Sequence, residues 1–170
     1  MKLNLSLAIQ VLLSTTITLL FTGCASKPEV KPDAVDANIK MYTTVWDEII
    51  NHGKLELFND SNFTKNIVMH EGSLDVVGID SARSYYANFV NGFSNITFTI
   101  KDVFGQGDKL VKYWNFKGTH AGVFFGIQPT NKIVNLDGVT LVRMENGKIA
   151  EERDIFDNLE FSQQLGLLER

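Results

Sequence analysis

Apolar residues recur at spacings of three and four in the first half of the chain and at a spacing of two in the second half. From Ile39 to Ile50 the helical spacing predicts an amphipathic helix over residues 36–51, which Gly53 would end. The next segment, residues 55–63, is predicted to form a second, short helix. The folded part of the chain therefore begins with helices.

A third helix is predicted after Ser81, whose hydroxyl could cap the first turn, with Gly92 just past the helix end. Two short segments precede this helix: residues 66–70 are a strand candidate, and residues 72–78 are a loop or a short strand. Beyond Gly92 the apolar period changes to two, which is typical of strands.

Four strands with alternating apolar and polar positions are predicted in the second half. Turn residues separate them, and the Asn146-Gly147 pair is the strongest hairpin signal in the chain. The predicted strands span residues 96–104, 109–120, 132–143 and 148–156. Helices followed by an antiparallel meander indicate an α+β domain whose helices cover one face of the sheet.

The N-terminal segment has the composition of an export signal. Lys2 precedes an apolar run over residues 3–20, and small residues follow before Cys24. A short positive start, an apolar middle and a small-residue cleavage site are typical of a secretory signal peptide, predicted here over residues 1–23. Cys24 is the only cysteine of the chain, which excludes an intramolecular disulfide.

A cysteine after Thr-Gly resembles the lipobox of bacterial lipoproteins and predicts lipidation of Cys24. The alternative is an ordinary signal peptide followed by a stray thiol. Ala25 resembles an outer-membrane sorting signal, so we expect a lipid-anchored protein of the bacterial cell envelope that faces the periplasm. Residues 24–36 contain prolines and charges and are predicted to be a flexible tether. Residues 37–170 would form one domain.

Charge and motif content exclude several classes of function. The net charge is −4, from 16 basic and 20 acidic residues, and the basic residues are scattered. Nucleic-acid-binding surfaces gather lysine and arginine, so no nucleic-acid partner is expected. The chain has no nucleophile motif, phosphate loop or dinucleotide fingerprint. No histidine and carboxylate residues have metal-site spacing, so we expect neither a metal nor a cofactor.

Short motifs in the second half resemble those of the SnoaL-like polyketide cyclase, or ester cyclase, family. They are Gly118-Thr119-His120-Ala121-Gly122, Gly126-Ile127-Gln128-Pro129-Thr130, Arg143-Met144-Glu145-Asn146-Gly147-Lys148-Ile149, and Asp157 before Gln164-Leu165-Gly166. The resemblance runs from about Ile39 to Leu168. It implies the NTF2-like cone, in which a curved antiparallel sheet packs on N-terminal helices around an internal pocket.

The last predicted strand carries the residues that this resemblance marks as functional. Strand alternation puts two sets of side chains on opposite faces: Glu151, Arg153, Ile155 and Asp157 on one, and Ala150, Glu152, Asp154 and Phe156 on the other. In the family the first face lines the cone, and Asp157 falls at the position of the catalytic acid/base. A carboxyl group in an apolar cavity has a raised pKa and can exchange protons with a substrate. The alternative role of Asp157 is to cap a helix over residues 158–168.

Arg153 stands where family members commonly carry tryptophan. Between Glu151 and Asp157 it would pair with one carboxylate and lower the pKa of that group, while offering a bidentate donor to an anionic substrate. The same three residues resemble an epoxide-hydrolase trio, in which an arginine between two carboxylates activates water.

The resemblance also implies roles for two histidines and for the pocket wall. His120 and His70 would polarise a carbonyl group or orient the substrate; the alternatives are a turn residue and a structural or rim residue. The predicted substrate-binding wall comprises Trp114, Phe116 and Tyr85, together with Arg153 and Glu151. Tyr85 and Tyr86 are adjacent, and we expect only one of them to face the pocket.

The leading hypothesis is an exported, lipid-anchored domain that binds a small apolar or carbonyl-bearing molecule. If it is an enzyme, the family implies cofactor-free acid/base chemistry of the cyclase or isomerase type. Two alternatives stay open: a non-catalytic ligand-binding or envelope-accessory module, and epoxide-hydrolase-like hydrolysis. The expected partners are a small molecule, the membrane through Cys24, and a second copy of the chain in a homodimer.

Overall fold

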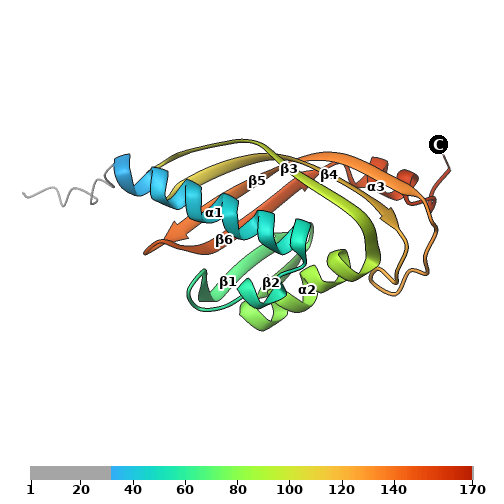
Figure 1. The fold of residues 1–170 in the computed structure, drawn as a ribbon, viewed down its shortest axis with the longest axis horizontal. Coiled ribbons are helices and arrows are strands. Elements are labelled where there is room, and N and C mark those ends of the chain that lie inside the picture. The colour runs from blue at the N-terminus through green and yellow to red at the C-terminus, as the bar shows by residue number, and fades with distance from the viewer. Residues whose placement is uncertain (1–31, 170) are drawn as a thin grey trace, which may run out of the picture.

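The computed structural model describes residues 32–169 (Figure 1). The predicted signal peptide, the lipidation of Cys24 and most of the predicted tether lie outside these residues. The elements are α1 (Pro32–His52), the 3-10 helix η1 (Leu55–Leu57), β1 (Phe63–Glu71), β2 (Leu74–Val77), α2 (Ile79–Gly92), β3 (Phe93–Gln106), β4 (Lys109–His120), β5 (Ile133–Glu145), β6 (Lys148–Phe156) and α3 (Asn158–Gln164). None of the described helices combines the length and the apolar character needed to span a bilayer.

The strands form one curved sheet in the order β2-β1-β6-β5-β4-β3. Strands β3 to β6 are the predicted antiparallel meander, and β1 and β2 extend the sheet beyond β6. The sheet is mixed, because β1 pairs with β6 in parallel while the other strand pairs are antiparallel. Figure 1 shows α1 and α2 together below the concave side of the sheet. The predicted α+β class and its cone-like architecture are confirmed.

Three helix predictions need correction. Helix α1 begins at Pro32, so residues 32–36 are helical and do not belong to a tether; proline is well tolerated at the first helical position, where its missing N–H would have no partner. Between residues 55 and 63 only the three residues of η1 are helical. Gly78, with φ of 88°, is the N-cap of α2, so Ser81 lies inside the first turn and does not cap it.

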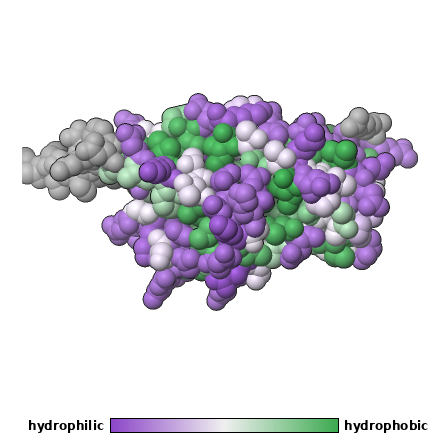
Figure 2. Space-filling view, viewed as in Figure 1, coloured by the Kyte–Doolittle hydropathy of each residue, from purple (hydrophilic) through white to green (hydrophobic). Residues whose placement is uncertain are grey.

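The core lies between α1 and the sheet. Tyr42, Trp46 and Ile49 recur on one helix face and are almost fully buried. Trp46 meets the ring of Phe58 edge-on at 6.0 Å, and Phe58 stacks on Phe63 of β1 at 4.8 Å. Offset and edge-to-face contacts between rings stabilise a core beyond the area that they bury. Polar residues cover most of the molecular face in Figure 2, with apolar patches between them.

Strand β4 shows the alternation that builds the site. Its residues are buried at every second position, which places Leu110, Lys112, Trp114 and Phe116 on the concave face. Because alternate side chains of a strand share a face, the lysine points to the same side as the two aromatic residues.

Candidate functional site

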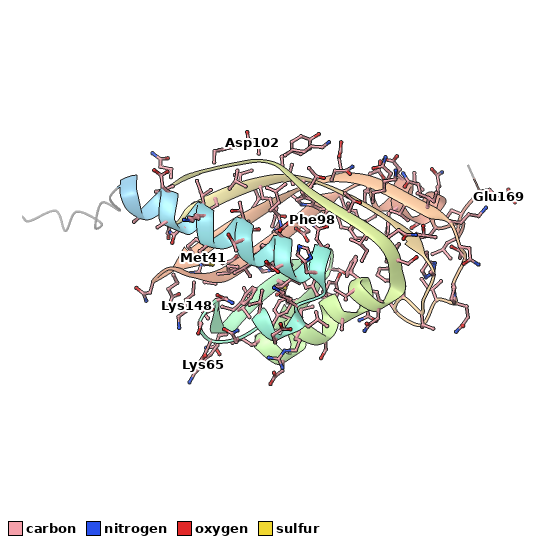
Figure 3. The ribbon with its side chains drawn as sticks, viewed as in Figure 1. Met41, Lys65, Phe98, Asp102, Lys148 and Glu169 are labelled. Atoms are coloured by element: carbon pink, nitrogen blue, oxygen red, sulfur yellow. The ribbon has the colours of Figure 1, made fainter. Side chains whose placement is uncertain are left out.

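A pocket lies between the concave face of the sheet and helices α1 and α2, and its empty volume is about 600 Å³, counting the part open to solvent. Side chains fill much of the space between α1 and the sheet, where Phe98 lies (Figure 3). The lining is mainly aromatic and aliphatic: Trp46, Ile50, Tyr85, Tyr86, Phe89, Phe98, Trp114, Phe116, Leu136, Phe156 and Phe161, with three ionisable residues, Glu71, Lys112 and Asp154. A largely apolar wall with a few polar groups is the usual composition of a small-molecule site.

Glu152 of β6 lies directly behind this wall and is only 3% exposed. Its Oε1 accepts hydrogen bonds from the hydroxyl of Tyr42 at 2.5 Å and from Nε1 of Trp46 at 3.1 Å. Burial raises the pKa of Glu152 to about 8, although the charge of Lys112 opposes the shift. The group is therefore mainly a neutral acid at neutral pH.

Asp154 lies two residues further along β6 and lines the pocket. Its Oδ1 accepts a hydrogen bond from Oγ1 of Thr140 at 2.5 Å, and its Oδ2 accepts one from the hydroxyl of Tyr86 at 3.2 Å. Nε1 of Trp114 in turn donates to Oγ1 of Thr140 at 2.9 Å. Two hydroxyl donors thus fix the orientation of this carboxyl group, and an indole fixes one of the donors.

Glu71 ends β1 at the edge of the pocket. Its Oε2 accepts a hydrogen bond from the hydroxyl of Tyr85 at 3.0 Å. Burial, followed by the nearby charge of Asp154, raises the pKa of Glu71 to about 7. A carboxyl group with this pKa can take up and release protons at neutral pH.

Lys112 of β4 is 3% exposed, and among the described lysines it alone is buried. Its Nζ lies 4.6 Å from the ring centroid of Trp46 and 5.2 Å from that of Tyr42. Burial lowers the pKa of Lys112, and the charges of Glu152 and the other two carboxyl groups partly offset this effect. Contacts with aromatic faces stabilise the cationic form without an ion pair.

A gap in the sheet connects the pocket with the surface. The last parallel pair between β1 and β6 is His70 with Arg153, so the end of β6 has no strand beside it on that side. Beside the end of β6 the surface forms a second, more open hollow, here called the outer hollow. Its lining residues are His70, Glu71, Gly72, Tyr85, Arg153, Asp154, Ile155, Phe156 and Asn158. Four of these residues, Glu71, Tyr85, Asp154 and Phe156, also line the pocket. The outer hollow and the pocket therefore adjoin each other at these four residues.

The assignment of the β6 faces made from sequence was wrong. The alternation is as predicted, but Ala150 and Glu152 are buried while Arg153 and Ile155 are exposed. Asp157 is exposed, and its Oδ1 accepts the backbone N–H of Glu160 at 2.9 Å. The alternative role of Asp157, the N-cap of α3, is thus the one observed, and the carboxyl group does not line the pocket.

The predicted trio of Glu151, Arg153 and Asp157 does not form a cluster. Glu151 is on the convex face, where Nε of Arg143 donates to it at 3.0 Å and Nε2 of His70 lies 3.1 Å away. Among the side chains of residues 34–169, no carboxylate oxygen lies within 4.0 Å of the Arg153 guanidinium. The arrangement expected for epoxide-hydrolase-like water activation is therefore absent from the described part of the chain.

Neither predicted histidine lines the pocket. His120 is fully buried, with its Nδ1 3.1 Å from Oγ1 of Thr130 and its ring packed on Phe93. His70 lies on the convex side, between Asp75 and Glu151. The aromatic candidates Trp114, Phe116 and Tyr85 do line the pocket, and Tyr86 lines it too, contrary to the expectation that only one tyrosine would. Their role in substrate binding stays a prediction.

Sequence reasoning missed the polar residues in the pocket wall and directly behind it: Tyr42, Glu71, Lys112, Thr140, Glu152 and Asp154. The signal for Lys112 was available, because it is in phase with Trp114 and Phe116, which were assigned to the pocket wall. Glu152 and Asp154 were recognised as sharing a face, but that face was assigned to the outside. No local pattern marked Glu71, since its position depends on where β1 ends beside β6.

Comparisons with known proteins agree with this architecture. The family model of the SnoaL-like polyketide cyclases matches residues 39–165. Among solved structures, a SnoaL-like polyketide cyclase from Jannaschia sp. CCS1 has a TM-score of 0.73 and 21% identity, covering 84% of this chain and 99% of that chain. TsrD from Streptomyces laurentii has a TM-score of 0.68 and 21% identity, covering 82% of this chain and 100% of that one. A polyketide cyclase from Bacillus cereus ATCC 10987 has a TM-score of 0.63 and 25% identity, and the match covers 84% of this chain and 96% of that chain. No curated protein sequence matches significantly.

Proposed function

The chain belongs to the SnoaL-like polyketide cyclase family, and from this premise we propose that its pocket binds a small, largely apolar, carbonyl-bearing molecule and transfers protons on it without a cofactor. The reaction would be of the cyclase or isomerase type. Such chemistry needs a group that removes a proton beside the carbonyl and a donor for the oxygen that becomes negative.

The observation that carries this proposal is the meeting of Asp154 and Lys112 on the wall of one aromatic pocket. Tyr86 and Thr140 both donate to Asp154 and fix its orientation on the pocket wall, which makes it the candidate base. Lys112 presents N–H groups to the same space, where they can bind the carbonyl oxygen. Glu71, with a pKa of about 7, can exchange the proton with solvent at the opening.

A proton-exchange assay tests this function without knowledge of the natural substrate. The full-length protein is incubated in D2O with small cyclic ketones such as 2-tetralone and 1-indanone, and NMR follows deuterium entering beside the carbonyl group. Asp154→Asn should reduce the exchange at least 100-fold, the lower range for loss of a general base. Glu151→Gln is the matched control, because Glu151 lies on the same strand but on the convex face. Full exchange in Asp154→Asn would contradict the role of Asp154.

One observation favours the second candidate, a binding module without turnover. Both carboxylate oxygens of Asp154 already accept hydrogen bonds from within the protein, so a ligand competes with Tyr86 and Thr140 for contact with this group. Binding can be measured separately, because the two tryptophans of the chain, Trp46 and Trp114, both line the pocket. Quenching of their fluorescence by a ketone, with no deuterium exchange over the panel, would favour the binding module.

We further propose that the protein is exported and lipid-anchored through Cys24, and that it forms a homodimer. The support for the anchor is the lipobox-like sequence before Cys24. Metabolic labelling with an alkyne fatty acid should modify the wild-type chain and not Cys24→Ser. Exposed apolar residues on the convex face of the sheet, Tyr113, Leu141 and Ile155, are the support for association, which analytical ultracentrifugation would measure.

A further inference from the structure

Lys112 is a nucleophile-bearing side chain in a place where lysine is rarely found. It is the fourth residue of β4, on the concave face, and is flanked along that face by Leu110 and Trp114. Only 3% of the residue is exposed to solvent, yet Lys112 lines the pocket. A lysine fully buried in an apolar environment is normally paired with a carboxylate.

This pairing is missing. Among the side chains of residues 34–169, no carboxylate oxygen lies within 4.0 Å of Nζ, and Nζ donates no hydrogen bond. The contacts of Nζ are the faces of Trp46, Tyr42 and Phe98, at 4.6, 5.2 and 5.3 Å from the ring centroids. The amine thus packs against aromatic rings in the wall of the pocket that Lys112 lines.

From this geometry we propose that Lys112 forms an imine with an aldehyde or ketone that enters the pocket. This inference rests on the proposed function, because it assumes a carbonyl-bearing ligand. It deepens that function by replacing a hydrogen bond to the carbonyl oxygen with a covalent bond from nitrogen to the carbonyl carbon. A protonated imine withdraws electrons from the neighbouring carbon more strongly than a hydrogen-bonded carbonyl group, which makes the proton there easier to remove.

The residues around the amine supply the proton transfers that the step requires. The lone pair of the neutral amine attacks the carbonyl carbon, the π pair moves to oxygen, and this oxygen takes a proton from the carboxyl group of Glu71. The nitrogen then loses a proton to the carboxylate of Asp154. The proton held by Asp154 then passes to the hydroxyl group, the C–O bond breaks, water leaves, and the nitrogen lone pair forms the C=N bond of a protonated imine. The amine, the carbonyl group and the proton from Glu71 thus give a protonated imine, water and the Glu71 carboxylate, so no oxidant or reductant is consumed.

The desolvation of Lys112 favours this reaction over the same reaction at surface lysines. Burial lowers the pKa of Lys112, so a larger share of it is the neutral, nucleophilic amine at neutral pH than for an ordinary lysine. Lys117, on the same strand, is exposed and serves as the internal comparison.

Reductive trapping tests the proposal. The full-length wild-type protein is incubated with 2-naphthaldehyde and sodium cyanoborohydride, and peptide mass spectrometry locates each added mass, which equals the aldehyde less one oxygen. We expect the peptide containing Lys112 to be modified several times faster than that containing Lys117. The alcohol 2-naphthalenemethanol, which lacks a carbonyl group, should protect Lys112 by occupying the pocket and leave Lys117 unaffected. Lys112→Met should lose the fast adduct, and Lys117→Met should keep it.

The outcomes separate this inference from the proposed function. Modification of exposed lysines alone, while the aldehyde still quenches the fluorescence of Trp46 and Trp114, overturns the imine and leaves carbonyl binding intact. Absence of both quenching and a Lys112 adduct overturns the imine and the proposed function together. Because the site of modification is read in the wild-type chain, the test does not depend on the folding of Lys112→Met.

Discussion

The hydroxyl of Tyr42 in α1 donates a hydrogen bond of 2.5 Å to Oε1 of Glu152 in β6. This contact joins the first helix to the last strand across 110 positions of the sequence, and both side chains are almost fully buried. Nε1 of Trp46, one turn further along α1, donates to the same oxygen. The pair therefore fixes the position of α1 against the sheet behind the pocket.

Removal of the Tyr42 hydroxyl should destabilise the protein. In Tyr42→Phe the shape of the ring is kept, but a buried acceptor on Glu152 loses one of its two donors, which costs about 1–3 kcal/mol. Urea unfolding at neutral pH measures the change. Tyr113→Phe is the control, because the Tyr113 hydroxyl bonds to Lys101 and Asp137 at the exposed surface, and its loss should change the free energy of unfolding by less than about 0.5 kcal/mol. Equal costs for both variants would contradict the importance of the buried bond.

The stability of the protein should fall as the pH rises from about 4.5 to about 8. Glu152 has a pKa of about 8 in the folded protein against an ordinary value of 4.5, so between these values the folded chain holds a proton that the unfolded chain has lost. This stabilisation is complete below the pKa that Glu152 has in the unfolded chain, and it is lost as the pH rises through the pKa of the folded protein. The free energy of unfolding falls by about 1.4 kcal/mol per pH unit for one such group. Glu71 adds to the slope up to about pH 7.

Glu152→Gln should reduce this slope, because glutamine resembles the protonated acid and does not titrate. Urea unfolding at about pH 5, 6.5 and 8 measures it. Glu151→Gln is the control: hydrogen bonds from Arg143 and His70 lower the pKa of Glu151, so this group titrates below the interval. A slope that is the same in Glu152→Gln as in the wild type would show that another group causes the pH dependence.

Asp157 should contribute to stability and not to pocket chemistry. Its carboxylate caps α3 by accepting the N–H of Glu160, so Asp157→Ala should cost about 1 kcal/mol of unfolding free energy. Asp157→Asn keeps an acceptor oxygen and should cost little. Ketone binding, measured by tryptophan quenching, should be unchanged in both variants. Loss of binding in Asp157→Asn with stability intact would restore the functional role that the sequence had predicted.

Strand β6 shows how much of the structure the sequence could predict: its limits were predicted correctly, but not which of its two faces is buried. The limits of β4 and β6 and the turn at Asn146-Gly147 follow from local alternation and from the positive φ that such a turn needs, which is 51° at Asn146 and 77° at Gly147. Alternation also sorts the side chains of β6 into two faces, but it cannot say which face is covered. That choice depends on Tyr42 and Trp46, more than 100 positions away, whose donors make the burial of Glu152 tolerable.

Lys112 illustrates the opposite case. Its alternation with Trp114 and Phe116 is visible in the sequence and indicates a place on the pocket wall, but the sequence prediction did not include it there. Lysine is almost always exposed, so a lysine between apolar positions is normally read as the solvent side of a strand. Its phase with Trp114 placed it inside, and the aromatic faces that receive it come from α1 and β3. These aromatic contacts offset the cost of burying the lysine, and they form only in the folded protein, so the sequence of β4 alone cannot predict them.

The contact between Gly138 and Trp114 leads to a last prediction. These residues are directly paired across β5 and β4, and a Cβ added to Gly138 would lie 2.2 Å from Cζ2 of the indole. The indole must then move, which breaks the bond from its Nε1 to Thr140 and frees the hydroxyl that orients Asp154. Alanine normally stabilises a strand relative to glycine, but overpacking of this kind costs about 1–3 kcal/mol and should prevail.

Urea unfolding of Gly138→Ala should therefore show a net loss of stability, and ketone quenching should weaken because Trp114 forms part of the pocket wall. The decisive comparison is a double-mutant cycle with Trp114→Leu, which removes the indole that the new methyl group meets. In that background Gly138→Ala should cost nothing or stabilise the strand, because only the backbone effect is left. An equal cost in both backgrounds would mean that the indole contact does not explain the glycine, and that the backbone of β5 at this position requires it for another reason.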